Sequence, residues 1–207
     1  MNSANLDSEV LVGKWIFRYI DSGTGERGYP GFQLLHVFPD LTAHLYRKFT
    51  LSEKWQTLKI SNDVMHTTND VKFAEYQLLN EDQIVFLIEG KANDRDAIFK
   101  LHFVRLKPTI TELGKEELEG LSFYFVENER ETVFSFKKED VDEKKHISSE
   151  DNPKTRYMIE KIDDTFFVSI FSNQKREASF QIKEVNNELM VLDVPILPED
   201  VVAKRKH

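Results

Sequence analysis

The chain has 207 residues, carries a formal net charge of -8 and contains no cysteine. The lack of cysteine excludes disulfides, thiolate zinc sites and cysteine nucleophiles, and it is typical of a reducing compartment. The acidic balance disfavours nucleic acid as a partner, because phosphate backbones are bound by clustered Lys and Arg. Residues 1–10 lack the basic and apolar parts of a leader, and no apolar run approaches the roughly 18 residues that span a bilayer. We therefore expect a cytoplasmic protein with no membrane partner.

Short runs rich in Phe, Tyr, Val and Ile follow one another through the first half, and turn residues separate them. Such runs are typical of the strands of a sandwich or barrel, because aromatic and β-branched side chains favour strands. In chain order, we expect strands at residues 13–20, 32–38, 42–50, 54–60, 63–68, 71–79, 83–89 and 97–106. The sequence predicts that these strands form an antiparallel meander.

Polar turn residues connect these runs. Pro39 and Asp40 favour a β-turn between the second and third strands, because Pro fixes φ and Asp can bond its own backbone. Residues 61–63 and 80–82 have a similar composition, and residues 92–96 predict a longer polar loop. Hairpins are therefore the expected connections.

A second domain is expected to begin near residue 109. Pro108 ends the last strand of the first half, and Thr111 could cap a short helix whose first turns hold several Glu. The predicted domains are residues 1–108 and 109–207.

The order of motifs in the first half recurs in the second half, about 100 to 107 residues later, which indicates an internal duplication. The matched pairs are Leu11-x-Gly13 with Leu118-x-Gly120, residues 39–42 with 139–142, Trp55 and Ile60 with Tyr157 and Ile162, residues 74–78 with 178–182, and residues 84–87 with 189–192.

The second half also departs from this plan. Gly120 is not followed by a tryptophan, and Pro195 and Pro198 follow the last matched strand. Because proline cannot donate a ladder hydrogen bond, an eighth strand is not expected there. The second barrel could be incomplete, open, or closed by strands from the first.

The opening Gly13-Lys14-Trp15, followed by an eight-strand meander, resembles the lipocalin-like (calycin) β-barrels, including small bacterial lipocalin-like domains. The resemblance spans residues 8–107. It implies that Trp15 seals one end of the barrel and that Arg105, from the last strand, lies across the indole as a cation–π partner. Gly13, Trp15 and Arg105 would then close the barrel. The expected fold class is all-β, with two tandem up-and-down barrels, or half-open barrels, joined by a short helical linker.

The same resemblance implies a non-catalytic protein that binds a small apolar molecule in its first barrel. The residues expected to contact the ligand are Phe32, Phe38, Phe86, Phe99 and Phe103. Ligand pockets start near about 300 Å³, so this function requires a cavity of at least that size. The alternative is that these side chains simply fill the interior.

His36 and His44 flank the turn at residues 39–41. If that loop contains three residues, Phe38 pairs with Thr42 and His36 lies opposite His44, with Cβ atoms about 5 Å apart. A two-residue loop would separate the imidazoles. The pair could share a metal or titrate near neutral pH, but no third ligand is visible, so we expect no metal site.

The sequence contains no Gly-x-Ser-x-Gly, phosphate loop or His-Glu-x-x-His motif. Its carboxylates lie in stretches typical of solvated turns, whereas paired catalytic carboxylates need burial to separate their pKa values. We therefore expect neither an enzyme nor a cofactor.

The negative charge is concentrated in the second half, since residues 1–108 carry a net charge of -1 and the remainder -7. An alternative function is therefore an interaction module, such as an inhibitor or adaptor, that presents acidic loops to a basic protein partner. Acidic loops that merely keep the protein soluble are the simpler explanation. The loops concerned are residues 127–131, 139–143, 149–151 and 184–188.

Overall fold

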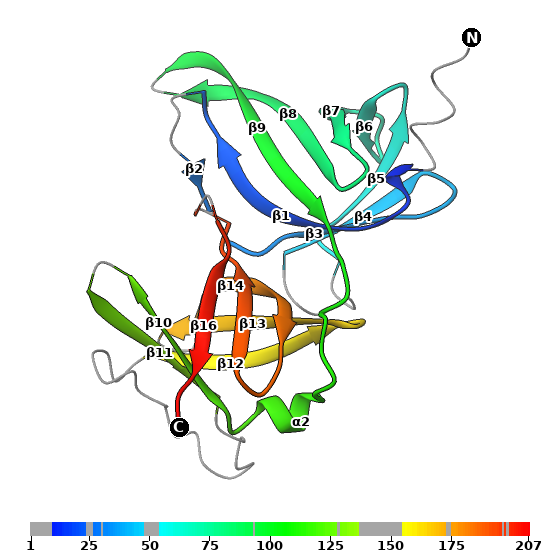
Figure 1. The fold of residues 1–207 in the computed structure, drawn as a ribbon. Helices are drawn as coiled ribbons and strands as arrows, with labels where there is room; N and C mark the ends of the chain where they lie inside the picture. Colours follow the sequence, from blue (N-terminus) through cyan, green and yellow to red (C-terminus); the bar gives the residue numbers. More distant parts are fainter. Residues whose placement is uncertain are drawn as a thin grey trace. The chain divides into compact units, whose positions relative to one another are not determined.

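The computed structural model describes residues 10–23, 27–29, 31–47, 54–92, 94–127, 129–136, 155–172, 175–195, 197 and 199–207. The chain divides into two compact units, Met1–Leu106 and Lys107–His207, so the division lies just before the boundary predicted after Pro108. Both units consist of antiparallel strands, which confirms the predicted all-β class (Figure 1). Among the described residues, no helix is long and apolar enough to cross a membrane.

The first unit contains all eight strands that the sequence predicts, together with one very short additional strand, β2. Their bounds are β1 Gly13–Asp21, β2 Arg27–Gly28, β3 Leu34–Val37, β4 Thr42–Tyr46, β5 Gln56–Ser61, β6 Val64–Thr67, β7 Lys72–Asn80, β8 Gln83–Ala92 and β9 Arg95–Arg105. Each strand from β3 to β9 pairs with its neighbour in sequence, and β1 pairs with both β3 and β9. The meander therefore closes into a barrel (Figure 1).

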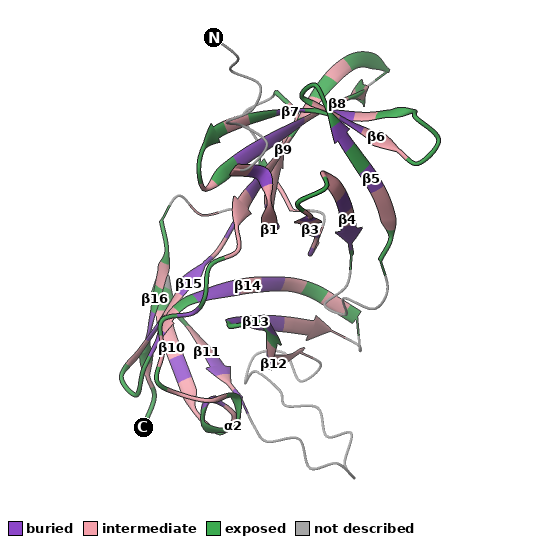
Figure 2. Cartoon of the chain, turned by 90° about the vertical axis from the view of Figure 1, so that its right-hand side faces the viewer, coloured by how far each residue is buried: buried purple, intermediate pink, exposed green. Residues whose placement is uncertain are grey.

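Alternation along the strands fills this barrel. In β7, Ala74 and Tyr76 are buried while Glu75 and Gln77 are exposed, as expected when successive side chains point to opposite faces. Figure 2 shows buried, intermediate and exposed stretches along the strands. The enclosed core is made of buried side chains from every strand except β2 and from Leu11, just before β1. Its members are Leu11, Trp15, Phe17, Leu35, Val37, Ala43, Leu45, Leu58, Ile60, Met65, Ala74, Tyr76, Ile84, Phe86 and Phe103.

The hairpin between β3 and β4 has the three-residue loop that brings its histidines together. The amide of Phe38 donates to the carbonyl of Thr42 at 2.9 Å, and Leu41 adopts a φ of 59°. This left-handed residue is typical of three-residue hairpin loops. The register pairs His36 with His44, as expected for the three-residue alternative.

The prediction of a long loop at residues 92–96 is wrong, because β8 and β9 stay paired almost up to the turn that joins them. Ala92 pairs with Arg95, and Asp94 adopts a φ of 62°. Aspartate tolerates the left-handed conformation that such a tight turn requires. The polar composition therefore indicated the turn correctly but not its length.

The second unit is a curled sheet with the order β11-β10-β16-β15-β14-β13-β12. Its strands are β10 Ser122–Glu127, β11 Arg130–Ser135, β12 Thr155–Ile162, β13 Thr165–Ser172, β14 Lys175–Val185, β15 Leu189–Asp193 and β16 Val201–Arg205, preceded by the short helix α2, Lys115–Leu118. Its first and last strands, β10 and β16, pair like β1 and β9. The described sheet ends at β11 and β12, and residues 137–154 between them lie outside the described residues.

The expectation that no further strand follows the prolines is wrong. Pro195 lies in the connection after β15, and the chain resumes pairing at Val201. Strand β16 then pairs with both β15 and β10. Proline prevents pairing only where it stands, so prolines in a connection leave the next strand free to form.

The segment that follows β9 belongs to the second unit. The hydroxyl of Thr109 donates to the carbonyl of Ile182 at 2.7 Å and accepts from the amide of Phe166 at 2.8 Å. Ile110 continues the contact through a parallel bridge to Glu184. Residues 107–110 therefore fill the gap where β13 and β14 separate, which explains why the division lies at Leu106.

The two units repeat a detailed turn as well as a strand order. In the first unit, the side-chain Oδ1 of Asn80 accepts a hydrogen bond from the backbone amide of Asp82 at 2.9 Å. In the second unit, Oδ1 of Asn186 accepts one from the backbone amide of Glu188 at 2.8 Å. The backbone carbonyl of Asp82 accepts a hydrogen bond from the amide of Arg105, and the backbone carbonyl of Glu188 accepts one from the amide of Arg205. These contacts support the inferred duplication.

The turns also correct one predicted alignment. Counted from them, Ile84 corresponds to Met190 rather than to Leu189, and both Ile84 and Met190 are buried. A shift of one residue exchanges inward for outward positions on a strand, so burial decides the alignment. The predicted match of residues 39–42 to 139–142 lies outside the described residues on its second side.

Candidate functional site

A fully buried indole lies near the start of β1 in the first barrel. Trp15 is 0% exposed, and its Nε1 donates to the carbonyl of Leu11 at 2.8 Å. The guanidinium carbon of Arg105 lies 4.2 Å from the centre of the Trp15 ring. The two residues can meet because they pair directly across β1 and β9. This is a favourable cation–π geometry.

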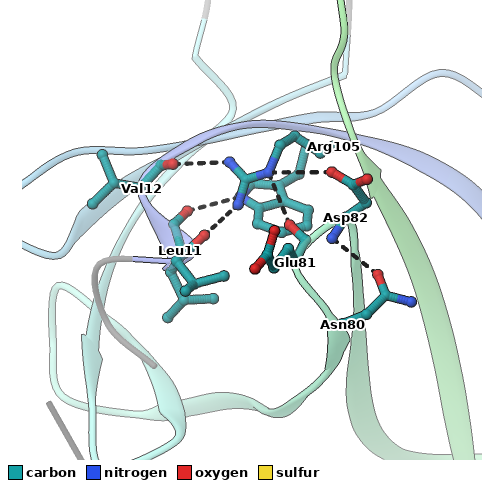
Figure 3. Close-up of polar contacts among 8 residues, drawn as sticks. Leu11, Val12, Asn80, Glu81, Asp82 and Arg105 are labelled. Carbon is teal, nitrogen blue, oxygen red and sulfur yellow. Dashed lines mark hydrogen bonds and ion pairs between the residues drawn. The ribbon is translucent and has the colours of Figure 1, made fainter. Parts of the chain in front are cut away.

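Arg105 also donates to three carbonyls in two separate backbone segments (Figure 3). Its Nη1 donates to the carbonyl of Val12 at 3.0 Å, and its Nε donates to the carbonyl of Glu81 at 2.9 Å. Its Nη2 donates to the carbonyl of Val10. The fork of a guanidinium suits this task, since several donors are held in one plane. Arg105 therefore connects the start of β1 to the turn between β7 and β8.

Gly13 leaves the space that this arrangement needs. Its φ is +129°, a conformation that residues with a Cβ rarely adopt. A Cβ at this position would lie 2.9 Å from Nη1 of Arg105. The motif Gly-x-Trp and the distant arginine thus form one structural unit. We call it the closed end, because the resemblance to lipocalin-like barrels implies closure there.

The other half of the same barrel contains a partly open cavity of about 160 Å³. Its lining is apolar except for Gln33 and Arg47. Trp15 does not contribute to the lining. The lining residues are Gln33, Leu35, Leu45, Arg47, Trp55, Leu58, Met65, Phe73, Phe86, Ile88, Leu101 and Phe103.

The opening of the cavity is marked by the exposed members of the lining. Trp55 is 46% exposed and Arg47 is also exposed, whereas Leu45, Leu58 and Phe86 are buried. Arg47 follows the last residue of β4, and Trp55 stands just before β5. Both therefore lie at the barrel end opposite to Trp15.

Two of the five phenylalanines expected at a ligand site line the cavity, namely Phe86 and Phe103. The other three lie elsewhere. Phe32 is buried outside the lining, and Phe38 contacts His36 and His44 through its ring. Phe99 packs against Gly90, where a Cβ would lie 2.8 Å from the Phe99 ring.

The expectation of a cavity of at least about 300 Å³ is wrong, because the cavity in the first barrel has only about 160 Å³. Aromatic rings occupy much of the interior, since Phe103 packs edge-on against Phe17 and Phe86 at centroid distances of 5.3 and 5.1 Å. In this barrel some phenylalanines therefore fill the interior, as Phe17 does, and others form the cavity wall, as Phe86 and Phe103 do.

Sequence reasoning missed Gln33, Arg47 and Trp55 as parts of this site. Trp55 was matched to Tyr157 only as a strand residue, and Arg47 was expected within a strand that the structure ends at Tyr46. A signal was present in the sequence, because a tryptophan and an arginine on either side of one loop can meet at a barrel rim. Recognising it required the strand ends, which are the least predictable part of a β-sheet sequence.

The paired histidines lie on a half-buried ladder of rings on β3 and β4, and they do not contribute to the cavity lining. Nδ1 of His44 lies 3.2 Å from the hydroxyl of Tyr46, and burial lowers the pKa of His44 and raises that of Tyr46. Among the described residues, no group of three His, Asp or Glu side chains could hold a metal ion.

The acidic loops of the second half fall largely where the structure gives no description. Residues 139–143 and 149–151 lie outside the described residues, as does part of 127–131. Glu131 pairs with Lys206 at 2.8 Å, so this carboxylate already has a basic partner. Interaction through these loops stays a prediction.

Comparisons with known proteins add little to this description. No protein-family model matches the chain, and no curated protein matches it. A similar solved structure is that of a protein of unknown function from the DUF3598 family of Nostoc punctiforme PCC 73102, with 12% sequence identity and a TM-score of 0.33. The similarity covers 93% of this chain and 75% of that one. A TM-score of this size does not establish a shared fold.

Proposed function

We propose that the first barrel is a lipocalin-like binding protein that holds a small, mainly apolar molecule at its open end. The observation that carries this proposal is the cavity of about 160 Å³, which has apolar walls and an exposed rim. The sealed end formed by Trp15 and Arg105 supports it, because a barrel closed on one side can admit a ligand only from the other.

The size of the cavity defines the size of the ligand. Pockets for drug-sized molecules start near about 300 Å³, whereas an apolar cavity of about 150 Å³ accommodates benzene. The proposed ligand is therefore a single ring or a short aliphatic chain. Burial of each methylene contributes about 0.8 kcal/mol, so a short chain supplies enough free energy for binding in the micromolar to millimolar range.

The fluorescence of Trp55 provides a direct test with octan-1-ol as the probe. Trp55 lines the cavity and is partly exposed, whereas the second tryptophan, Trp15, is buried at the sealed end. Iodide quenching therefore reports mainly on Trp55. We expect saturable protection of Trp55 from iodide as octan-1-ol binds.

Two matched variants locate the binding site. Ile88→Phe enlarges a side chain of the cavity wall, and Ile98→Phe makes the same change at a 56%-exposed position on the neighbouring strand. We expect the first variant to weaken octan-1-ol binding at least fivefold and the second to bind like the original protein. The absence of saturable binding, or equal binding by both variants, would contradict the proposal.

A further inference from the structure

The polar groups of the cavity lie together at its rim. The register of β3 and β4 ends with Leu34 opposite Tyr46, and Gln33 and Arg47 are the residues next to this last pair, toward the open end. They are the polar members of the lining. The cavity therefore combines an apolar interior with one amide and one cation at its entrance.

Arg47 is held in a defined position there. Its guanidinium carbon lies 3.4 Å from the centre of the Trp55 ring, so the two groups stack closely. Stacking leaves the edge of a guanidinium, with its N–H donors, available to an acceptor in the same plane. Within the described part of the chain, the structure shows this stacking contact for Arg47 and neither an ion pair nor a hydrogen bond.

From this juxtaposition we infer that the ligand is a small amphiphile with a carboxylate group, whose apolar body enters the cavity and whose carboxylate is bound by Arg47 and Gln33. This inference rests on the proposed function and specifies its ligand class. Arginine binds a carboxylate through two parallel N–H···O bonds, and the amide of Gln33 supplies a further donor. Trp55 would cover the apolar body from the outside and fix the plane of the guanidinium.

A site for a carboxylate differs from a purely apolar site in the contacts on which ligand binding depends. A neutral ligand of the same length would leave the guanidinium in contact with water, and would therefore depend on the walls alone. A carboxylate ligand would depend on both the walls and Arg47, and its binding would weaken as salt increases, because the rim is exposed and charge pairs at such positions are screened.

Isothermal titration calorimetry of the full chain with octanoate and with octan-1-ol provides the test. Three proteins are compared: the original chain, Arg47→Gln, and Arg95→Gln as a control. Arg95 is an exposed arginine that does not line the cavity, so its variant removes the same charge and leaves the cavity wall unchanged. Circular dichroism confirms that each variant is folded.

We expect octanoate to bind the original chain more tightly than octan-1-ol does. Arg47→Gln should weaken octanoate about tenfold, as the loss of a charged hydrogen bond at an exposed rim implies. The same variant should change octan-1-ol binding less than twofold, and Arg95→Gln should alter neither. If both probes bind and Arg47→Gln affects them equally, the inferred carboxylate class is wrong and the proposed function stands. If neither probe binds the original chain, the proposed function fails as well.

Discussion

Replacement of Arg105 by methionine tests whether the closed end depends on this side chain. Methionine keeps much of the apolar stem over Trp15 and removes every N–H donor. Arg105 donates to three carbonyls and lies over the Trp15 ring, and its side chain is only 24% exposed. The change therefore leaves partly buried acceptors without a partner.

The hydrogen bonds dominate the expected loss. Each bond from a charged donor contributes about 1.5–3 kcal/mol, but water can replace part of this at a partly exposed site. The cation–π contact adds about 0.5–1 kcal/mol. The ion pair with Asp82, at 3.8 Å and with a 46%-exposed carboxylate, adds about 0–1 kcal/mol. We expect Arg105→Met to lower the free energy of unfolding by about 3 kcal/mol.

Tryptophan fluorescence during urea denaturation measures this loss, since both tryptophans lie in the first unit. The matched control is Arg205→Met. Arg205 pairs with Phe123 as Arg105 pairs with Trp15, but its Nη1 donates to the carbonyl of Asn187 at a long 3.4 Å. We expect this control to leave the fluorescence transition unchanged. A loss below about 1 kcal/mol for Arg105→Met would show that the arginine does not fasten the closed end.

Three further predictions concern the backbone, the segment before β10 and the histidines. Gly13→Ala should destabilise the first unit by about 1–3 kcal/mol through its positive φ and should also displace Arg105, whereas Gly120→Ala has a similar φ but no atom within 4 Å of the added Cβ. A fluorescence transition that does not move for Gly13→Ala would contradict this reasoning. Thr109→Val keeps the shape of a buried side chain and removes both of its hydrogen bonds, so far-UV circular dichroism should show a loss of about 2 kcal/mol in the second unit; an unchanged transition would mean that residues 107–110 do not stabilise it. Burial lowers the pKa of His102 in the folded protein. As the pH falls, the unfolded chain therefore binds a proton at this histidine before the folded chain does. The free energy of unfolding should decrease as the pH drops below about 6.5 and should stop decreasing once the pH is below the folded-state pKa. His102→Gln should reduce that dependence in denaturation curves between pH 8 and 5, and an unaltered slope would show that this histidine is not responsible.

The sequence predicts the architecture well because the signal is local. Alternating side chains and polar turns place all eight strands of the first unit. The turn at Asp40 left two loop lengths open, and the structure selects the one that pairs His36 with His44. The contact between Arg105 and Trp15 was expected from the resemblance to lipocalin-like barrels, and the structure shows it at 4.2 Å between paired positions of β1 and β9. These features depend on neighbours in sequence or on a fixed register.

The cavity could not be predicted in the same way. Whether Phe86 and Phe99 bound a cavity or fill space depends on the volumes of side chains from several strands, which no local pattern encodes. The rim was missed because Arg47 and Trp55 meet only through the ends of β4 and β5. The strand after Pro195 was missed because the length of its connection, and not its composition, decides where pairing resumes.

A ligand site in the first barrel is tested most directly by a methyl-labelled NMR titration of the full chain with octanoate. We expect shifts to concentrate on methyl groups of the cavity wall, such as those of Leu45, Leu58 and Ile88, and methyl groups of the second unit, such as those of Leu192, to stay unchanged. Saturable shifts that centre on the second unit, or no saturable shifts at all, would contradict the assignment of a ligand site to the first barrel.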